Sequence, residues 1–287
     1  MRFVTGGESG TYYALGTIMA QHANNNAGLD ITAVSSDGSK ANVLDLDDGV
    51  AQLAFCQSDV ASYAYEGTTF DDFKGMPITA FSTVADLYEE QVQIITCNPE
   101  IKSVADLKGK NVSIGAAGSG VYFNAIDILG VYDITENDIT ASYQSFQDSA
   151  DSLKDGKIDA AFIVAGAPTS AVTDLTTTKD AYLVAIDEDH AQKLIEKSAF
   201  YNATKIAGGT YKGNDDDVAT VSVDALVLAH NDVSEDDVYA FVADIFDNID
   251  ELAESNAKFK EFSLEKAASY KVVPYHAGAQ KYYDEKK

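Results

Sequence analysis

The chain has 287 residues and a mass of 30.7 kDa, which exceeds one domain of typical size and favours two. Hydrophobic residues make up 46% of it, charged residues 23%, and no apolar run reaches the roughly 18 residues of a membrane span. Its 46 acidic and 20 basic residues give a net charge of -26, which repels phosphate backbones and anionic membranes. These values predict a soluble globular protein and exclude nucleic-acid binding.

Two residue types are scarce in the chain. Arg2 is the single arginine, so the interior has no guanidinium group that could hold a carboxylate or phosphate by two hydrogen bonds. Cys56 and Cys97 have neither CxxC spacing nor histidine partners, so we expect no metal site and no cofactor. The start, MRFVTGG, lacks the pattern of a signal peptide. It predicts either a cytoplasmic protein or a mature chain whose signal segment has been removed.

Hydrophobic periodicity in the first third alternates between the values typical of strands and of helices. A helix at 11–23 places Tyr12, Leu15, Met19 and Ala23 on one apolar face. The other predicted elements are a strand at 2–5, a Gly-rich turn at 6–10, a strand at 31–34, a helix at 39–46, a strand at 51–56, a helix at 60–65 capped by Ser58, and extended runs at 78–87 and 91–96.

After Asn98 and Pro99 the alternation starts again. It predicts helices at 104–107, 121–129, 146–154 and from 166–168 onward, strands at 112–115, 139–143, 160–164, 181–186 and 219–229, and a long amphipathic helix at 235–254.

Two α/β lobes without a flexible linker follow from this pattern. We expect lobe I at 1–95 and 216–287 and lobe II at 96–215, with 91–98 and 219–229 crossing between them as hinge strands. Such lobes enclose a cleft where strand ends face the starts of the following helices.

Four loops rich in Gly, Ser and Asp follow a strand and open a helix, at 4–12, 35–39, 57–59 and 116–123. Loops of this kind direct backbone N–H groups, hydroxyl groups and the positive end of a helix dipole at one point, so they can hold a carboxylate without arginine. The alternative is that their Gly and Ser residues serve only as turn and cap residues. The recurrence of four loops in equivalent positions favours a binding role.

Nucleotide binding and catalysis have little support in the residues. Neither a G-x-x-x-x-G-K-[ST] nor a G-x-G-x-x-G motif is present. Ser9 and Ser119 lie in Gly-rich turns but do not fit G-x-S-x-G, so a serine hydrolase is the weaker alternative. The four histidines are scattered and the acidic runs lack the spacing of a calcium loop, which indicates structural or solvated side chains.

Aromatic residues flank two of these loops. Tyr12 and Tyr13 begin one helix, and Tyr122 and Phe123 begin another. They either line a ligand cleft or belong to the lobe cores, and the core interpretation is strongest for Tyr13 and Phe123. Tyr201, after the last strand of lobe II, is open to the same two interpretations.

The motifs together resemble the solute receptors of tripartite ATP-independent periplasmic (TRAP) transporters, in the TAXI subfamily. The resemblance covers nearly the whole chain and follows family order. Ala207, Gly208 and Ala277 depart from the family pattern, at turns rather than at ligand positions. The matching segments are VTGGESGTYYALG, SDGSKANVLDLDDGVAQLAFCQSD, SIGAAGSGVYFNA, IAGGTYKGNDDDVATVSVDALVLAH and VVPYHAGAQKYYDE.

The resemblance implies a type II periplasmic-binding fold that closes on a small solute, often an amino acid or dicarboxylate, and delivers it to a membrane permease. It implies an extracytoplasmic, non-enzymatic monomer, and secretion makes a Cys56–Cys97 disulfide possible. A ligand-sensing partner of a membrane signalling protein would share the same pocket. Carried over residue by residue, the ligand-binding positions are Ser9, Gly10, Thr11, Tyr12, Ser36, Ser39, Gln57, Ser58, Gly118, Ser119, Val121, Tyr122, Gly166 and Pro168.

Overall fold

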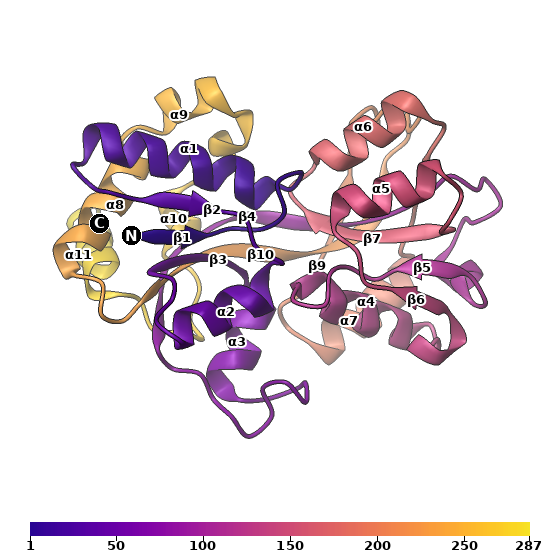
Figure 1. Cartoon of the computed structure of the whole chain (residues 1–287), viewed down its shortest axis with the longest axis horizontal. Coiled ribbons are helices and arrows are strands. Elements are labelled where there is room, and N and C mark those ends of the chain that lie inside the picture. The colour runs from indigo at the N-terminus through magenta and orange to yellow at the C-terminus, as the bar shows by residue number, and fades with distance from the viewer. The chain divides into compact units, whose positions relative to one another are not determined.

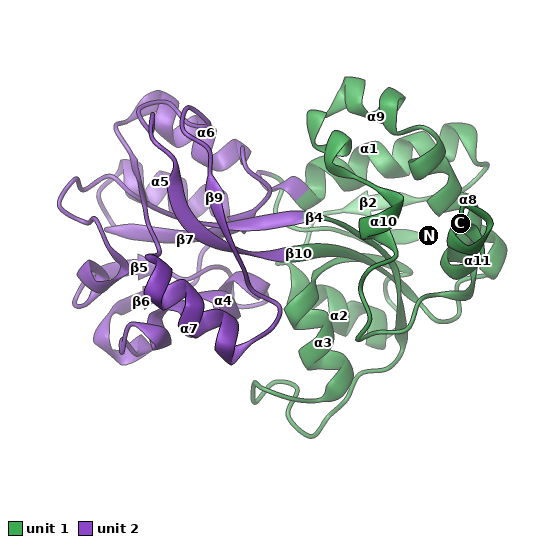
Figure 2. Cartoon of the chain, turned by 180° about the vertical axis from the view of Figure 1, so that it is seen from behind, with its two compact units in different colours: residues 1–8, 12–88, 224–287 green, residues 9–11, 89–223 purple.

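The computed structural model describes all 287 residues, which form two compact units (Figure 2). Unit 1 comprises Met1–Glu8, Tyr12–Tyr88 and Asp224–Lys287, and unit 2 comprises Ser9–Thr11 and Glu89–Val223. None of the helices combines the length and apolar character that crossing a membrane requires.

Unit 1 is a sheet covered by helices. Strand β1 (Arg2–Val4) pairs in parallel with β2 (Thr32–Val34) and β3 (Leu53–Gln57), and β10 (Val218–His230) runs antiparallel to β3. The helices are α1 (Thr11–Asn26), α2 (Ser39–Asp47), α3 (Ser58–Glu66), α8 (Glu235–Asp247), α9 (Ile249–Ser255), the 3₁₀-helix η3 (Ala257–Glu261), α10 (Leu264–Ala267) and α11 (Ala277–Glu285) (Figure 1).

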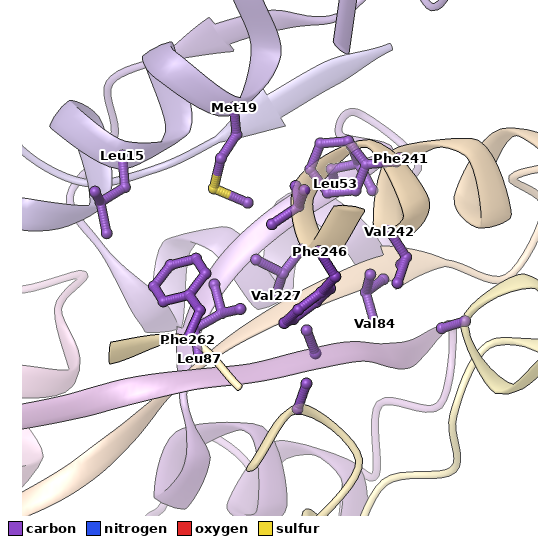
Figure 3. Close-up of a cluster of buried hydrophobic side chains, with 14 of the residues drawn as sticks. Leu15, Met19, Leu53, Val84, Leu87, Val227, Phe241, Val242, Phe246 and Phe262 are labelled. Carbon is purple, nitrogen blue, oxygen red and sulfur yellow. The ribbon is translucent and has the colours of Figure 1, made fainter. Parts of the chain in front are cut away.

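The core of unit 1 joins the apolar face of α1 to the sheet and to the C-terminal helices. The predicted face of α1 is buried, and Leu15 and Met19 lie opposite Leu53 and Val227 in Figure 3. Phe3 of β1 stacks on Phe55 of β3, with ring centroids 5.2 Å apart. Strands far apart in the sequence are therefore fixed together by one apolar cluster.

Unit 2 contains the remaining strands of the ten-stranded sheet. Strand β4 (Phe81–Thr96) runs antiparallel to β7 (Ala160–Ala165) and β8 (Tyr182–Val184), and β9 (Asn202–Ile206) runs antiparallel to β10. Strand β5 (Asn111–Ser113) is parallel to both β6 (Thr140–Ser142) and β7. The helices are η1 (Val104–Leu107), α4 (Gly120–Val131), η2 (Glu136–Asp138), α5 (Phe146–Lys154), α6 (Ser170–Thr178) and α7 (Glu188–Lys197).

Strand β7 is buried on both faces, so unit 2 has two apolar clusters. Phe162 and Val164 pack into one cluster, and Ala161 and Ile163 into the other. This arrangement explains why the strand reads as a continuous apolar run rather than an alternating one.

Two long strands carry residues of both units. In the order β2-β1-β3-β10-β4-β7-β5-β6, β4 and β10 are neighbours, and each continues from unit 1 into unit 2. The extended runs expected at 78–87 and 91–96 are one strand, because Glu89 and Glu90 interrupt the apolar pattern without ending β4. The single helix expected at 235–254 is wrong, since Asn248 separates α8 from α9.

Candidate functional site

The first candidate loops, in unit 1, are held together by the side chain of Asn42. Its Nδ2 donates to the backbone oxygens of Thr5 and Phe55, each at 2.7 Å, and so joins the residue after β1 to the middle of β3. Asn42 is fully buried on α2, so this pair of bonds fixes the edge of the sheet from which the loops project.

Ser36 and Ser39 each accept a backbone N–H in these loops, and Ser39 contacts Gln57. The Ser36 Oγ accepts the N–H of Gly38 at 3.1 Å, and the Ser39 Oγ accepts the N–H of Gln57 at 3.1 Å. Both serine hydroxyl protons remain available as donors. The turn interpretation and the binding interpretation of these serines are therefore compatible.

Gln57 is the last residue of β3 and is buried, with 2% of its surface exposed. Its backbone is the N-cap of α3, so the prediction that Ser58 caps this helix is wrong, and Ser58 is the first helical residue. The Gln57 Oε1 is buried without a hydrogen-bond partner. An orphaned buried acceptor costs free energy, and a solute donor would satisfy it.

Ser58 is positioned by two segments that lie far away in the sequence. The backbone N–H of Asp224 in β10 donates to the Ser58 Oγ at 3.1 Å, and the Tyr270 hydroxyl donates to the Ser58 carbonyl at 2.8 Å. Ser58 therefore keeps its own hydroxyl proton for another acceptor.

Beside Ser58 lies a charged cluster that the sequence did not reveal. Lys266 Nζ lies 2.6 Å from Asp224 Oδ1 and 3.5 Å from Asp86 Oδ1. Burial raises the pKa of Asp86 to about 7, and the neighbouring Asp224 adds to the increase, while Lys266 and Ser269 oppose it. The available signal was a lone aspartate within each of two apolar strands, β4 and β10.

In unit 2, Thr11 belongs with the loop after β7. Its hydroxyl donates to the Gly166 carbonyl at 3.0 Å, and the Thr169 hydroxyl donates to the same oxygen at 3.1 Å. Ser9 and Gly10 join Thr11 in this unit, although α1 continues into unit 1 from Tyr12. Gly166 is buried and Pro168 is exposed.

A buried hydrogen-bond network supports that loop. The Tyr211 hydroxyl accepts the N–H of Thr169 at 2.7 Å and donates to Gln93 Oε1. The Gln93 Nε2 donates to the carbonyl of Ala165 at 3.0 Å and to Thr169 Oγ1 at 2.9 Å. Strand β4 thus orients the end of β7 through the Gln93 amide.

The loop between β5 and α4 uses Ser119 as a helix cap. The Ser119 hydroxyl donates to the Ala116 carbonyl at 2.7 Å and accepts the N–H of Tyr122 at 3.3 Å. Its side chain is therefore committed within the loop. What remains for a solute are the N–H groups of Gly120 and Val121 at the start of α4, which have no intrahelical acceptor. Gly118, beside this cap, is partly buried.

Three of the aromatic and apolar candidates pack inward. Tyr12 stacks on Phe55, with centroids 4.6 Å apart, and is 9% exposed, while Val121 and Phe123 are buried in unit 2. Tyr122 is partly exposed, and its hydroxyl lies 3.4 Å from a carboxylate oxygen of Glu136. The side chains of Tyr12 and Val121 therefore belong to the apolar clusters of their units.

Cys56 and Cys97 are not joined by a disulfide in this structure. Cys56 is buried in β3 of unit 1, where its Sγ lies 3.3 Å from the Gln57 carbonyl. Cys97 follows β4 in unit 2. No group of three or more His, Cys, Asp or Glu side chains is placed to hold a metal ion.

The two-unit α/β architecture, with Gly- and Ser-containing loops between strands and helices, is the fold of periplasmic binding proteins. A protein of Bordetella bronchiseptica RB50 matches with a TM-score of 0.59 and 17% identity, covering 99% of this chain and 88% of that one. The chain itself matches the model of the NMT1-like family over residues 3–286 and belongs to that family.

Two further structures of this fold have named ligands. The alkanesulfonate-binding protein SsuA of Xanthomonas axonopodis pv. citri, bound to MOPS, has a TM-score of 0.54 and 16% identity, covering 100% of this chain and 90% of its own. PhnD1 of Prochlorococcus marinus MIT 9301, in complex with methylphosphonate, has a TM-score of 0.57 and 12% identity, covering 91% and 87%. Both are similar to this chain in fold.

Proposed function

We propose that the chain is an extracytoplasmic solute receptor that binds a small polar or carboxylate-bearing molecule and passes it to a membrane permease. The observation that carries this proposal is the buried Gln57 Oε1, which has no hydrogen-bond partner and lies next to Ser58 at a helix start. A chain that keeps such an acceptor unsatisfied loses stability, and a bound solute that donates to it would restore the missing bond.

The solute is of the amino acid or dicarboxylate class, and the permease is of the TRAP type, as the five TAXI-like segments indicate. Membership in the NMT1-like family and the small anions named for two matched structures support a receptor for a compact polar solute. In this chain an anionic group would be held by backbone N–H groups at the starts of α1 and α4 and by hydroxyl groups, because Arg2 is the single arginine.

The individual contacts are proposed as follows. Gln57 and Ser58 bind polar groups of the solute, with Ser36 and Ser39 beside them in unit 1. In unit 2 the backbone N–H groups at the start of α4, directly after Ser119, and the Thr11 hydroxyl oxygen contribute. The remaining proposed positions, acting mainly through the backbone, are Ser9, Gly10, Tyr12, Gly118, Val121, Tyr122, Gly166 and Pro168.

The test measures solute affinity and thermal stability separately in one variant of Gln57. A thermal-shift screen against amino acids, dicarboxylates, keto acids and neutral polar solutes identifies the ligand, since a solute that binds only the folded state raises Tm. In the variant Gln57→Met we expect affinity for that solute to fall about tenfold, the equivalent of one hydrogen bond of about 1.4 kcal/mol. The Tm of the solute-free protein should stay equal or rise, because a buried orphan acceptor has been removed.

Gln93→Met is the matched comparison in unit 2. The Gln93 amide has three hydrogen-bond partners, so its loss should lower the Tm of the solute-free protein. An unchanged affinity in Gln57→Met, or no Tm increase with any solute of the panel and no ligand in mass spectra of the denatured protein, contradicts the receptor proposal.

A further inference from the structure

The charged cluster of Asp86, Asp224 and Lys266 joins three elements of unit 1. Asp86 lies in β4, Asp224 in β10 and Lys266 in α10. The Asp86 side chain is 3% exposed, and the other two are partly exposed. Two carboxylates thus share one ammonium group, which leaves one excess negative charge when both are ionised.

The hydrogen bonds around Asp86 are too few for a buried carboxylate. Its Oδ1 has no hydrogen bond and meets only Lys266 Nζ at 3.5 Å, while its Oδ2 accepts a long bond of 3.3 Å from the Ser269 hydroxyl. A buried anion needs close donors on both oxygens, so this geometry suits the protonated acid. Lys266, at 2.6 Å, is then bonded mainly to Asp224.

The other titratable groups that face Asp86 add no positive charge. Besides Asp224 and Lys266, they are the hydroxyl groups of Tyr270, Tyr275 and Tyr283, from the segment after α10 and from α11. Within β4 itself, Glu90 is a second buried acid four residues further on, on the same face of the strand. An ionised Asp86 can therefore find compensation only by drawing Lys266 away from Asp224.

Asp224 and Tyr270 are also the residues that hold Ser58. The Asp224 N–H donates to the Ser58 hydroxyl oxygen and the Tyr270 hydroxyl to the Ser58 carbonyl. A shift of Lys266 toward Asp86 would release the Asp224 side chain and loosen the backbone bond that orients Ser58.

We propose that Asp86, Asp224 and Lys266 form a proton-responsive support for Ser58, which is firm while Asp86 is protonated and loosens when Asp86 ionises. This inference rests on the proposed function, because Ser58 is a proposed solute contact. It adds a regulation of that contact: the receptor binds its solute more tightly in mildly acidic than in alkaline medium, and the three charged residues act as positioning residues.

Amide hydrogen exchange of the solute-free full chain tests the support directly. The Asp224 amide reports its own bond to Ser58, and its protection is measured at pH 6 and pH 8.5, with correction for the intrinsic pH dependence of exchange. With a pKa near 7, the ionised fraction of Asp86 rises from about 9% to about 97% over this range. We expect the protection factor of the Asp224 amide to fall about tenfold.

The variant Asp86→Asn, which stays neutral, should keep high protection at both pH values. Lys266→Gln should have low protection at both, and Lys266→Arg should restore the wild-type profile; these two also serve if Asp86→Asn does not fold. Asp127→Asn, which removes a buried carboxylate bonded to Lys197 in unit 2, should retain the wild-type fall at Asp224. A purely structural role of the cluster would lower protection equally at both pH values.

Protection that is independent of pH in the wild type, or a fall that persists in Asp86→Asn, overturns the inference. Its failure is distinct from failure of the receptor proposal. Exchange is measured without solute, so a missing ligand leaves the exchange result valid. Conversely, if the protection of the Asp224 amide does not depend on pH while the solute binds normally, only the proposed regulation is refuted.

Discussion

Replacing Asp86 by Asn is expected to stabilise the protein at alkaline pH and to change its stability little near pH 4. Burial and Asp224 raise the pKa of Asp86 to about 7 in the folded chain, from 3.8 for a free side chain. Between these values the folded state binds the proton and the unfolded state does not, so the wild-type free energy of unfolding falls as pH rises from about 4 to 7.

The size of the effect follows from the pKa difference. The shift is 7 minus 3.8, or about 3 units, and each unit corresponds to about 1.4 kcal/mol, which gives about 4 kcal/mol. The side chain is 3% exposed, so solvent does not screen this cost. Asn is neutral at every pH and escapes it. The stability difference between Asp86→Asn and the wild type should therefore grow by about 4 kcal/mol between pH 4 and pH 8.

Urea unfolding at pH 4, 6 and 8, followed by circular dichroism and tyrosine fluorescence, measures this difference; the chain has 16 tyrosines and no tryptophan. The change between pH values is compared, so any fixed cost of the amide group cancels. Asp127→Asn is the control, because its carboxylate is bonded to Lys197 and Tyr201, and its loss should lower stability at pH 8. A difference for Asp86→Asn that stays constant from pH 4 to pH 8 would refute the reasoning.

Three other substitutions test the supports of the candidate loops. Asn42→Leu removes one donor from each of the Thr5 and Phe55 carbonyls and should lower the free energy of unfolding by about 3 kcal/mol, measured in urea. Gly115→Ala introduces a side chain where the backbone has a φ of 86°, and the new Cβ would lie 2.6 Å from Val121. The Tm should therefore fall by the equivalent of about 2–4 kcal/mol. An unchanged Tm would contradict the geometry of this loop. Tyr211→Phe leaves the buried Thr169 N–H without its acceptor and should lower the free energy of unfolding by about 1–3 kcal/mol in the same assay. An unchanged free energy of unfolding would mean that water replaces the hydroxyl group.

The α/β fold class was predictable because burial imposes a period on the sequence. The apolar face of α1 repeats at helical spacing, and β7 reads as an unbroken apolar run since helices cover both faces of its sheet. The predicted element boundaries were wrong where the sequence pattern and the backbone disagreed. Glu89 and Glu90 suggested a break, but an exposed and a buried acid are both compatible with the continuous strand β4. Asn248 gave too weak a signal for the break between α8 and α9.

The loops of the candidate site were also visible in the sequence, since Gly and Ser residues between a strand and a helix have recognisable chemistry. Their contacts were not. Ser58 depends on Asp224 and Tyr270, which lie 166 and 212 residues further along the chain, and no local pattern encodes such pairs. The Ser119 hydroxyl, in contrast, follows the ordinary cap rule, and its role within the loop was available as the alternative interpretation from the start.

Lys266 illustrates how the small number of positive charges in the chain limits the ways in which it can bind an anionic solute. Its ammonium group is bonded to Asp224, whose N–H donates to Ser58, but two carboxylates share this group, so its charge is already compensated and cannot also neutralise an anionic solute. A carboxylate bound near Ser58 must then rely on hydroxyl groups and backbone N–H groups, whose positions depend on β10 and α3 rather than on a mobile side chain. Discrimination between solutes would therefore follow hydrogen-bond geometry more than net charge, and the state of Asp86, through Lys266 and Asp224, becomes a direct determinant of that geometry.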